Sequence, residues 1–182
     1  MKGKGWQTTG IEPAETPRKF ARENFKLDVF EEDELDKFPG ERFDVITLWH
    51  VLEHVPDLNL RMSQIKRLLK ADGLLVIALP NHESWDASFY QTFWAAWDVP
   101  RHCYHFSKRT FSLLMKNHKM DILSTHPMTL DAYYISLLSE KYKNQKTGLL
   151  RAVFNGLRSN KSAIRNENNH SSLIFLVKQQ NI

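Results

Sequence analysis

The sequence predicts an α/β fold built on a doubly wound, mostly parallel sheet. Two short runs carry this prediction, residues 43–49 (Phe-Asp-Val-Ile-Thr-Leu-Trp) and 73–79 (Gly-Leu-Leu-Val-Ile-Ala-Leu). Neither run alternates polar with apolar residues, which is typical of strands covered on both faces. Between them, apolar side chains recur at helical spacing, at Leu58, Met62, Ile65, Leu68 and Leu69. Strand, helix and strand in this order form a βαβ unit, whose crossover we expect to be right-handed.

The segments on either side of this unit are expected to continue the alternation. Before it come a strand over 7–11, a helix over about 14–24 and a weak strand over 27–30; after it come a helix over 107–117, a strand over 120–124, a helix over 131–143 and a strand over 173–177. Asp57 is placed to cap the central helix, and Asp72-Gly73 to end it. In the helix over 14–24, Phe20 marks one face and Arg18 is expected to face solvent.

The chain is long enough for one domain, and we expect residues 1–182 to form a single one. The segment 84–106 is rich in aromatic residues and is expected to be an insertion or lid beside the site. The segment 144–171 is polar and rich in lysine and asparagine, which indicates a mobile loop or a weakly packed helix; we expect the loop.

Composition restricts the class of protein. No apolar run approaches the ~20 residues that span a bilayer, and the first ten residues lack the apolar segment of a signal peptide. Cys103 is the only cysteine, which excludes an intrachain disulfide and favours a reducing compartment. We therefore expect a cytoplasmic protein without a membrane span.

The charge is uneven along the chain. Residues 1–99 carry 12 Lys and Arg against 17 Asp and Glu, whereas residues 100–182 carry 13 against 4. A basic C-terminal half could attract an anionic partner, although a solvated lysine-bearing face explains it more simply. Basic residues and aromatics do not interleave as in single-strand binders, so we do not expect a nucleic-acid partner.

Sheets of this kind bind ligands beyond the carboxyl ends of their strands. Three groups of polar or aromatic residues fall there: Glu12 after the first strand, Trp49-His50 after the third and Pro80-Asn81 after the fourth. A carboxylate in the position of Glu12 commonly accepts hydrogen bonds from the two hydroxyls of a ribose. Taken alone, a surface glutamate would explain Glu12 as well.

Two motifs make the pattern specific. Residues 43–55 (Phe-Asp-Val-Ile-Thr-Leu-Trp-His-Val-Leu-Glu-His-Val) resemble the fourth strand and following turn of class I S-adenosylmethionine (SAM)-dependent methyltransferases of the small-molecule type, including ubiquinone-pathway O-methyltransferases. Residues 68–81 resemble the next helix and strand of that family. The resemblance implies a Rossmann-like methyltransferase sheet with an antiparallel last strand. It also implies methyl transfer from SAM to an unidentified, small-molecule acceptor.

The resemblance also implies roles for particular residues. Glu12 would hold the ribose of SAM, and Asp33 and Leu35, in the loop after the third strand of the family, would lie near the adenine. Trp49 and His50 would line the methionine and sulfonium end. Glu53 and His54 follow directly; they either contact the substrate or pair to fix the start of a helix.

The run 97–107 resembles the insertion after the fifth strand of this subgroup. His102 and His105, together with His54, are the candidate catalytic residues, since imidazole titrates near neutral pH and could take a proton from an acceptor hydroxyl. Structural hydrogen bonding is the plainer reading of these histidines. His102-Cys103 and His105 also offer metal ligands, but the spacing lacks the paired cluster of a zinc site, so we expect no metal.

One part of the family pattern is absent. The family begins with a strand and a glycine-rich turn that lets the backbone approach the cofactor, and this sequence has neither. That strand lies at the centre of the sheet, so its absence leaves two inner edges unpaired. We expect Met1 to be an internal methionine of a longer reading frame. The alternatives are a catalytically inactive methyltransferase-like fragment acting as a binding module, or a binder of anionic partners through the basic half.

Overall fold

The computed structural model describes residues 2–145 and 148–180. The strands are β1 (Thr9–Ile11), β2 (Asp28–Phe30), β3 (Phe43–Trp49), β4 (Leu69–Pro80), β5 (Met120–Pro127) and β6 (Ser172–Gln179). The α-helices are α1 (Glu15–Phe25), α2 (Leu58–Leu68), α3 (Trp85–Tyr90), α4 (Lys108–Asn117), α5 (Asp131–Asn144) and α6 (Leu149–Arg165). None of the helices in the described ranges is both long and apolar enough to cross a membrane.

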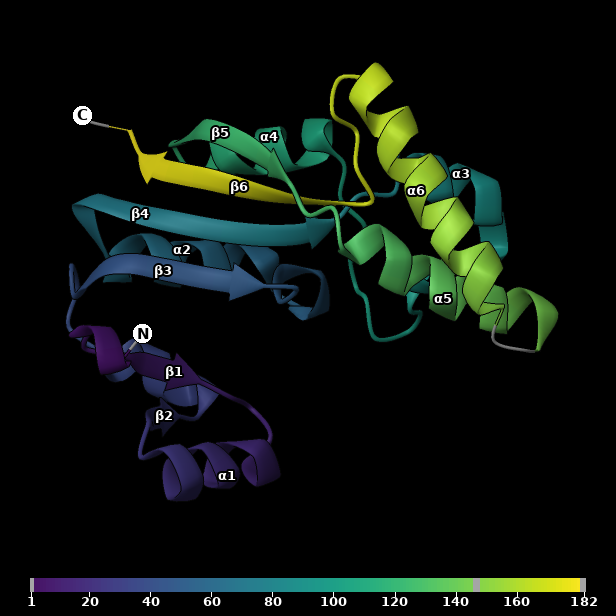
Figure 1. The fold of residues 1–182 in the computed structure, drawn as a ribbon. Helices are drawn as coiled ribbons and strands as arrows, with labels where there is room; N and C mark the ends of the chain where they lie inside the picture. Colours follow the sequence, from purple (N-terminus) through teal and green to yellow (C-terminus); the bar gives the residue numbers. More distant parts are fainter. Residues whose placement is uncertain (1, 146–147, 181–182) are drawn as a thin grey trace.

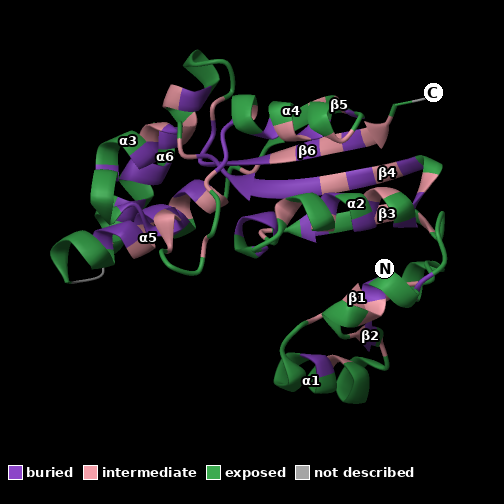
Figure 2. Cartoon of the chain, turned by 180° about the vertical axis from the view of Figure 1, so that it is seen from behind, coloured by how far each residue is buried: buried purple, intermediate pink, exposed green. Residues whose placement is uncertain are grey.

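Four strands form the main sheet, in the order β3-β4-β6-β5 (Figure 1). β3 and β4 are parallel, whereas β6 is antiparallel to both of its neighbours, β4 and β5. The predicted α/β sheet with an antiparallel last strand is therefore confirmed. Two helices cover one face of it, because Met62 and Ile65 of α2 and Phe111 and Met115 of α4 share one core cluster with Ile77 of β4. Figure 2 shows buried stretches in β4 and β6, the two central strands of this sheet, and also in α3, α5 and α6.

β1 and β2 form a separate parallel pair, which lies with α1 beside β3 in Figure 1. Among the described residues no strand pairs with the edge of β1 or of β3 that faces away from its partner, as expected for a sheet without its central strand. A small cluster joins this unit to the main sheet: Leu35 and Phe38 pack on Leu68 of α2, with Phe30 and Phe43 against them.

The orientation predicted for α1 is wrong. Arg18 is 7% exposed, whereas Phe20 is 57% exposed. The guanidinium of Arg18 donates to the backbone carbonyls of Glu12 and Pro13, at 2.7 and 2.9 Å, and to Oε1 of Glu31 at 2.6 Å. Because these acceptors replace water around the charged group, Arg18 can be buried at the start of the helix.

The central helix also ends earlier than predicted. Its N-terminus is capped by Asp57 as expected, through a 2.9 Å hydrogen bond from the amide of Leu60, but α2 stops at Leu68 and β4 begins at the next residue. Gly73 explains the difference: a Cβ there would lie 2.7 Å from the side chain of Leu69. Glycine at position 73 thus allows the backbone to pass close to the side chain of Leu69, where the register between β3 and β4 shifts.

The loop expected over 144–171 is largely a helix. α6 occupies Leu149–Arg165, while residues 146–147 lie outside the described part. The buried positions of this helix are small or polar: Ala152, Asn155, Gly156, Ser159 and Ala163. The large apolar residues of this helix, among them Leu150, Phe154 and Leu157, are exposed, so its packing does not follow the apolar face that a helical pattern would bury.

The aromatic segment 84–106 is also a packed element. It contains α3 and two short 3-10 turns, and it contributes Tyr90 and Trp94, which are 1% and 2% exposed. These rings pack against Ile135 of α5. With α5 and α6 the segment forms a helical layer beyond the carboxyl end of β4 (Figure 1). Its role beside an acceptor remains a prediction.

Candidate functional site

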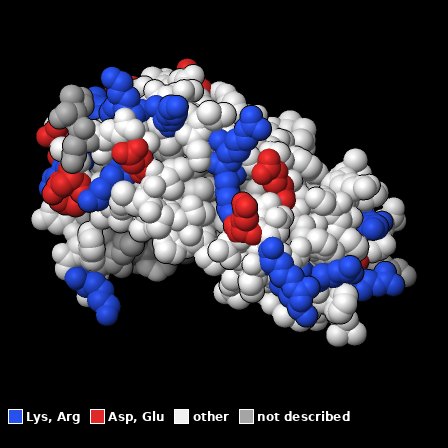
Figure 3. All heavy atoms as spheres, turned by 90° about the horizontal axis from the view of Figure 1, so that it is seen from above, with Lys and Arg blue, Asp and Glu red and all other residues white. Residues whose placement is uncertain are grey.

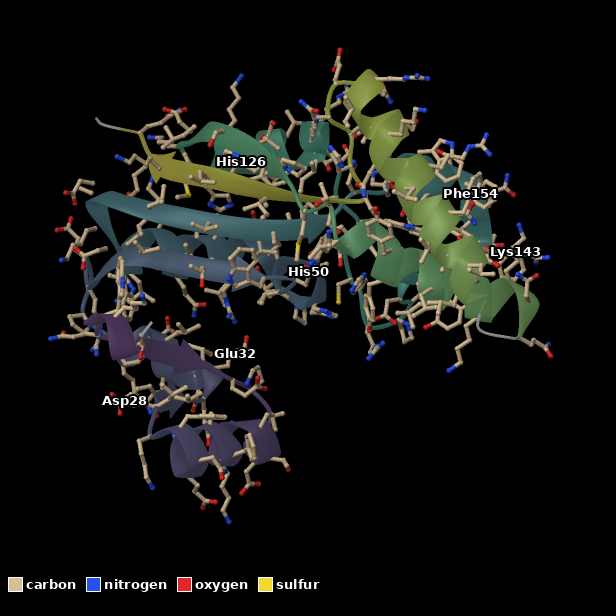
Figure 4. The ribbon with its side chains drawn as sticks, viewed as in Figure 1. Asp28, Glu32, His50, His126, Lys143 and Phe154 are labelled. Carbon is tan, nitrogen blue, oxygen red and sulfur yellow. The ribbon has the colours of Figure 1, made fainter. Side chains whose placement is uncertain are left out.

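The chain turns sharply where β3 ends. His50 has a φ of 52°, in the left-handed region, and its amide donates to the carbonyl of Ala78 at 3.1 Å. This turn directs its ring toward two carboxylates: Nδ1 lies 3.3 Å from Oε1 of Glu53, and Nε2 lies 3.7 Å from Oδ2 of Asp131. Figure 4 places His50 just beyond β3, near the start of α5. The carboxyl edge of the sheet therefore carries a histidine between two acids.

The electrostatics of this group follow from burial and from the two acids. The pKa of His50 is raised, chiefly by the Glu53 carboxylate and further by Asp131, while burial opposes the rise. Burial raises the pKa of Asp131, against a hydrogen bond from the hydroxyl of Ser172. Among the described residues neither carboxylate oxygen of Glu53 has a hydrogen-bond partner, so the 3.3 Å contact with His50 is a close approach and not a hydrogen bond. Their attraction is therefore that of nearby charges more than of a directed bond.

Glu12, the predicted ribose ligand, lies directly after β1 and is half-buried. Its Oε1 accepts a 2.9 Å hydrogen bond from the amide of Ala14, at the start of α1. The structure does not bring Glu12 to the His50 group, because β1 and β3 belong to separate sheets. Both residues nevertheless follow the carboxyl ends of parallel strands, as predicted.

The two residues predicted near the adenine differ in their surroundings. Asp33 and Leu35 lie in a 3-10 helix, Glu32–Lys37, and not in a loop. Asp33 is exposed and available to a ligand, whereas Leu35 is buried against Phe38 and Leu68. Trp49, predicted to line the methionine end, is 49% exposed at the end of β3.

The three candidate catalytic histidines gather around one loop. Cys103 and Tyr104 donate their backbone amides to the carbonyl of Glu53, at 2.7 and 3.2 Å, and so hold this loop against the turn after β3. The rings of His54 and His102 meet edge to face with centroids 4.5 Å apart, and those of His102 and His105 are 6.2 Å apart.

Each of these histidines contacts a backbone carbonyl. His54 Nδ1 lies 3.1 Å from the oxygen of Arg101, His102 Nδ1 lies 2.9 Å from that of Ala96, and His105 Nε2 lies 2.9 Å from that of Trp97. A carbonyl oxygen only accepts, so these ring nitrogens carry the hydrogen and the opposite nitrogen of each ring has the lone pair.

Other surface features do not define a site as clearly. A hollow of about 560 Å³ lies at the opposite end of the sheet, lined in part by Lys66, Arg67 and Lys119. It opens beside the start of β4, away from the edge where ligands of parallel sheets bind. Figure 3 shows the Lys and Arg side chains of one face in several separate groups, with acidic side chains between some of them, and not as one continuous patch.

These features lie within a recognisable family pattern. A family model described as "Methyltransferase domain" matches residues 1–125. The chain belongs to this family. The match includes β1 to β4, the turn with His50 and the loop with His102 and His105.

Two curated relatives share the name Ubiquinone biosynthesis O-methyltransferase. That of Actinobacillus pleuropneumoniae serotype 5b (strain L20) is 38% identical over 88 residues, which cover 42% of this chain and 38% of the relative. That of Bartonella tribocorum (strain CIP 105476 / IBS 506) is 42% identical over 48 residues, which cover 26% of this chain and 19% of the relative. The chain thus spans less than half the length of these relatives.

Solved structures show the fold. A SAM-dependent methyltransferase from Archaeoglobus fulgidus superposes with a TM-score of 0.58 at 16% identity, covering 98% of this chain and 78% of the other. A geranyl diphosphate methyltransferase in complex with SAM gives 0.60 at 15% identity, covering 97% and 70%. The Rossmann-like methyltransferase fold predicted from the two motifs is confirmed.

Sequence reasoning missed Asp131 as part of the His50 group. Asp131 begins α5, where an acidic residue is common because it complements the helix dipole. Nothing in the local pattern indicates that this helix starts beside the end of β3. Glu53 was noticed as a neighbour of the site, but its complete burial, at 1% exposed, was not predictable from a Leu-Glu-His sequence.

Proposed function

We propose that this protein takes part in the transfer of a methyl group from SAM to a small-molecule acceptor. The observation that carries the proposal is the match of residues 1–125 to the methyltransferase domain family, in a fold that presents Glu12, Trp49 and His50 after the carboxyl ends of parallel strands. SAM, when bound, supplies a methyl group made electrophilic by its sulfonium.

The residues of this edge fit part of such a ligand. Glu12 uses Oε1 for the amide of Ala14, so Oε2 remains available to a ribose hydroxyl. Hydrogen bonds of this kind to a carboxylate are charge-assisted and directional. The half-exposed ring of Trp49 offers an apolar wall, and Glu53 and Asp131 hold His50 beside it. Asp33, exposed in the 3-10 helix after β2, is our candidate for a polar contact near the adenine. The buried Leu35 would hold that short helix in place.

The acceptor side is assigned to the loop with His102 and His105. His105 is the candidate base, because its Nε2 is bound to the carbonyl of Trp97 and its Nδ1 is left to take a proton. The names of the two curated relatives favour a hydroxyl oxygen as the acceptor atom. Placing acceptor, methyl and sulfur in line is the principal task of such a site, and it needs no catalytic triad.

Calorimetric titration of the 182-residue chain with SAM tests the proposal. Glu12→Gln should weaken SAM binding roughly 10- to 100-fold, because hydrogen bonds to a charged group contribute about 1.5–3 kcal/mol. Glu15→Gln is the matched control: it removes the same charge from an exposed residue three positions along the chain and should bind like the unchanged protein.

Two results would count against the proposal in different ways. Unaltered binding in Glu12→Gln would remove Glu12 from the cofactor site. Failure of the unchanged chain to bind SAM would favour the alternative of an inactive methyltransferase-like binding module, which the family match by itself does not favour. A panel of hydroxyl acceptors assayed with methyl-labelled SAM, with and without His105→Gln, would then test the acceptor side.

A further inference from the structure

Three side chains with metal-binding atoms converge where the loop at 98–105 meets the turn after β3. Glu53 and His54 belong to the 3-10 turn Leu52–His54, and His102 belongs to the loop. One possible ligand atom from each of the three residues lies within 4.8 Å of the others. Glu53 and His54 are neighbours in the sequence, and folding brings His102 to them from the loop.

Glu53 supplies evidence that is independent of this clustering. Its side chain is 1% exposed, and neither carboxylate oxygen has a hydrogen-bond partner within residues 2–145 and 148–180. The nearest positive group is the ring of His50, whose Nδ1 is 3.3 Å from Oε1. Burying a carboxylate without hydrogen bonds is costly, and buried charges in proteins are usually paired or coordinate metals. A further cation beside Glu53 would therefore stabilise its buried carboxylate.

The two histidines are oriented as metal ligands are. In both rings Nδ1 is tied to a backbone carbonyl, that of Arg101 for His54 and that of Ala96 for His102. This leaves Nε2 as the lone-pair atom of each ring. A metal-binding histidine almost always donates its other ring N–H to a carbonyl or a carboxylate in this way, which fixes its tautomer and its direction. Asp98 adds negative charge nearby, with Oδ2 3.8 Å from Nε2 of His102.

We propose that Glu53, His54 and His102 bind a divalent transition-metal ion such as Zn²⁺. Two histidines and one glutamate form a known ligand set for zinc, with a fourth position left open to water or substrate. With metal–ligand bonds of about 2.1 Å, tetrahedral ligand atoms stand about 3.4 Å apart, so the three groups need to close in by roughly 1 Å. His54 is exposed and can make this adjustment.

The neighbourhood suits such an ion. Glu53, His102 and His105 line a narrow pocket beside the cluster. Cys103 is exposed, with its thiol 3.8 Å from the carbonyl of His54, and is not part of the ligand set. The proposal departs from the sequence-based expectation that the chain binds no metal. The site stands on its own geometry and does not depend on the proposed methyl transfer.

Calorimetry with Zn²⁺, using the untagged 182-residue chain stripped with a chelator, tests the proposal. We expect one ion per chain. His54→Gln and His102→Gln should each weaken binding at least tenfold, since even outer-shell changes cost 10- to 100-fold. His126→Gln is the matched control, because His126 is exposed on β5 outside the cluster (Figure 4).

Two readouts keep the result decisive if a variant folds poorly. His54→Gln alters an exposed side chain, so its far-UV circular dichroism should match that of the unchanged chain. Substitution with Co²⁺ should give the visible bands of a nitrogen and oxygen site, without thiolate charge transfer, and Cys103→Ser should leave them unchanged. Absence of Zn²⁺ binding, or equal binding by His54→Gln, His102→Gln and the control, would overturn the proposal.

Discussion

Asp86 offers the sharpest test of how the helical layer is attached to the sheet. Its carboxylate is completely buried and accepts three hydrogen bonds from distant segments: Trp94 Nε1 at 2.8 Å, Ser171 Oγ at 2.7 Å and Ser159 Oγ at 2.7 Å. One acid thus links α3 to Trp94 later in the aromatic segment, to the residue before β6 and to α6. Asp86→Ala would leave three buried donors without their acceptor.

The expected loss can be estimated bond by bond. A buried donor left without a partner costs about 1–3 kcal/mol, and the two serine hydroxyls can rotate toward other acceptors, so the lower part of that range applies. The three together amount to roughly 3–4 kcal/mol, a large part of the 5–15 kcal/mol that typically stabilises a domain. With a denaturant slope of about 2 kcal/mol per molar urea, the midpoint should fall by roughly 1.5–2 M.

Urea unfolding followed by tryptophan fluorescence measures this loss, and Trp94 reports from the network itself. Asp121→Ala is the control, because Asp121 is exposed and accepts one hydrogen bond from the side chain of Gln180. It should change stability by no more than about 0.5 kcal/mol. A loss below about 1 kcal/mol for Asp86→Ala would refute the reasoning, since it would mean that the three donors find other partners.

Two further predictions concern the contact between α5 and α6. A Cβ on Gly156 would lie 2.6 Å from the ring of Tyr133. Gly156→Ala should therefore destabilise the protein by about 1–3 kcal/mol through overpacking, despite the better helix propensity of alanine. Thermal unfolding measures this loss of stability, and an increase in stability would contradict the close packing of the two helices. The hydroxyl of Tyr90 donates to Glu140 at 3.1 Å and accepts from Asn155 at 2.9 Å. Tyr90→Phe should cost about 1–2 kcal/mol. Burial raises the pKa of Tyr90 to about 12, so ultraviolet titration of the folded protein should show one tyrosine that stays protonated at pH 11, and that tyrosine should be missing from the titration of Tyr90→Phe.

The parts of the fold that were predictable are those in which the local pattern and the packing agree. β3 has the predicted bounds, because a short run rich in β-branched residues and bounded by turn residues favours a strand. The start of α4 was predictable for a different reason: Ser107 and Thr110 form a capping box, which depends only on nearby residues.

The parts that were not predictable depend on contacts between distant residues. α6 packs through alanine, glycine, serine and asparagine. Its polar side chains can be buried because Asp86 and Glu140, which belong to other segments, accept hydrogen bonds from them. The same holds for the candidate site. The positions of Glu12 and His50 follow from strand ends, but the approach of His102 to Glu53 depends on a loop that no local signal directs.

The separation of β1, β2 and α1 from the main sheet has a consequence for the motions of the molecule. This unit is joined to the rest through the cluster around Leu35 and Phe38 and through the hydrogen bonds of Arg67 to the carbonyls of those two residues. No ladder of backbone hydrogen bonds crosses from β1 to β3 in the described part of the chain. In the 182-residue chain, the amides of β1 and β2 should therefore exchange with solvent sooner than those of β4 and β6.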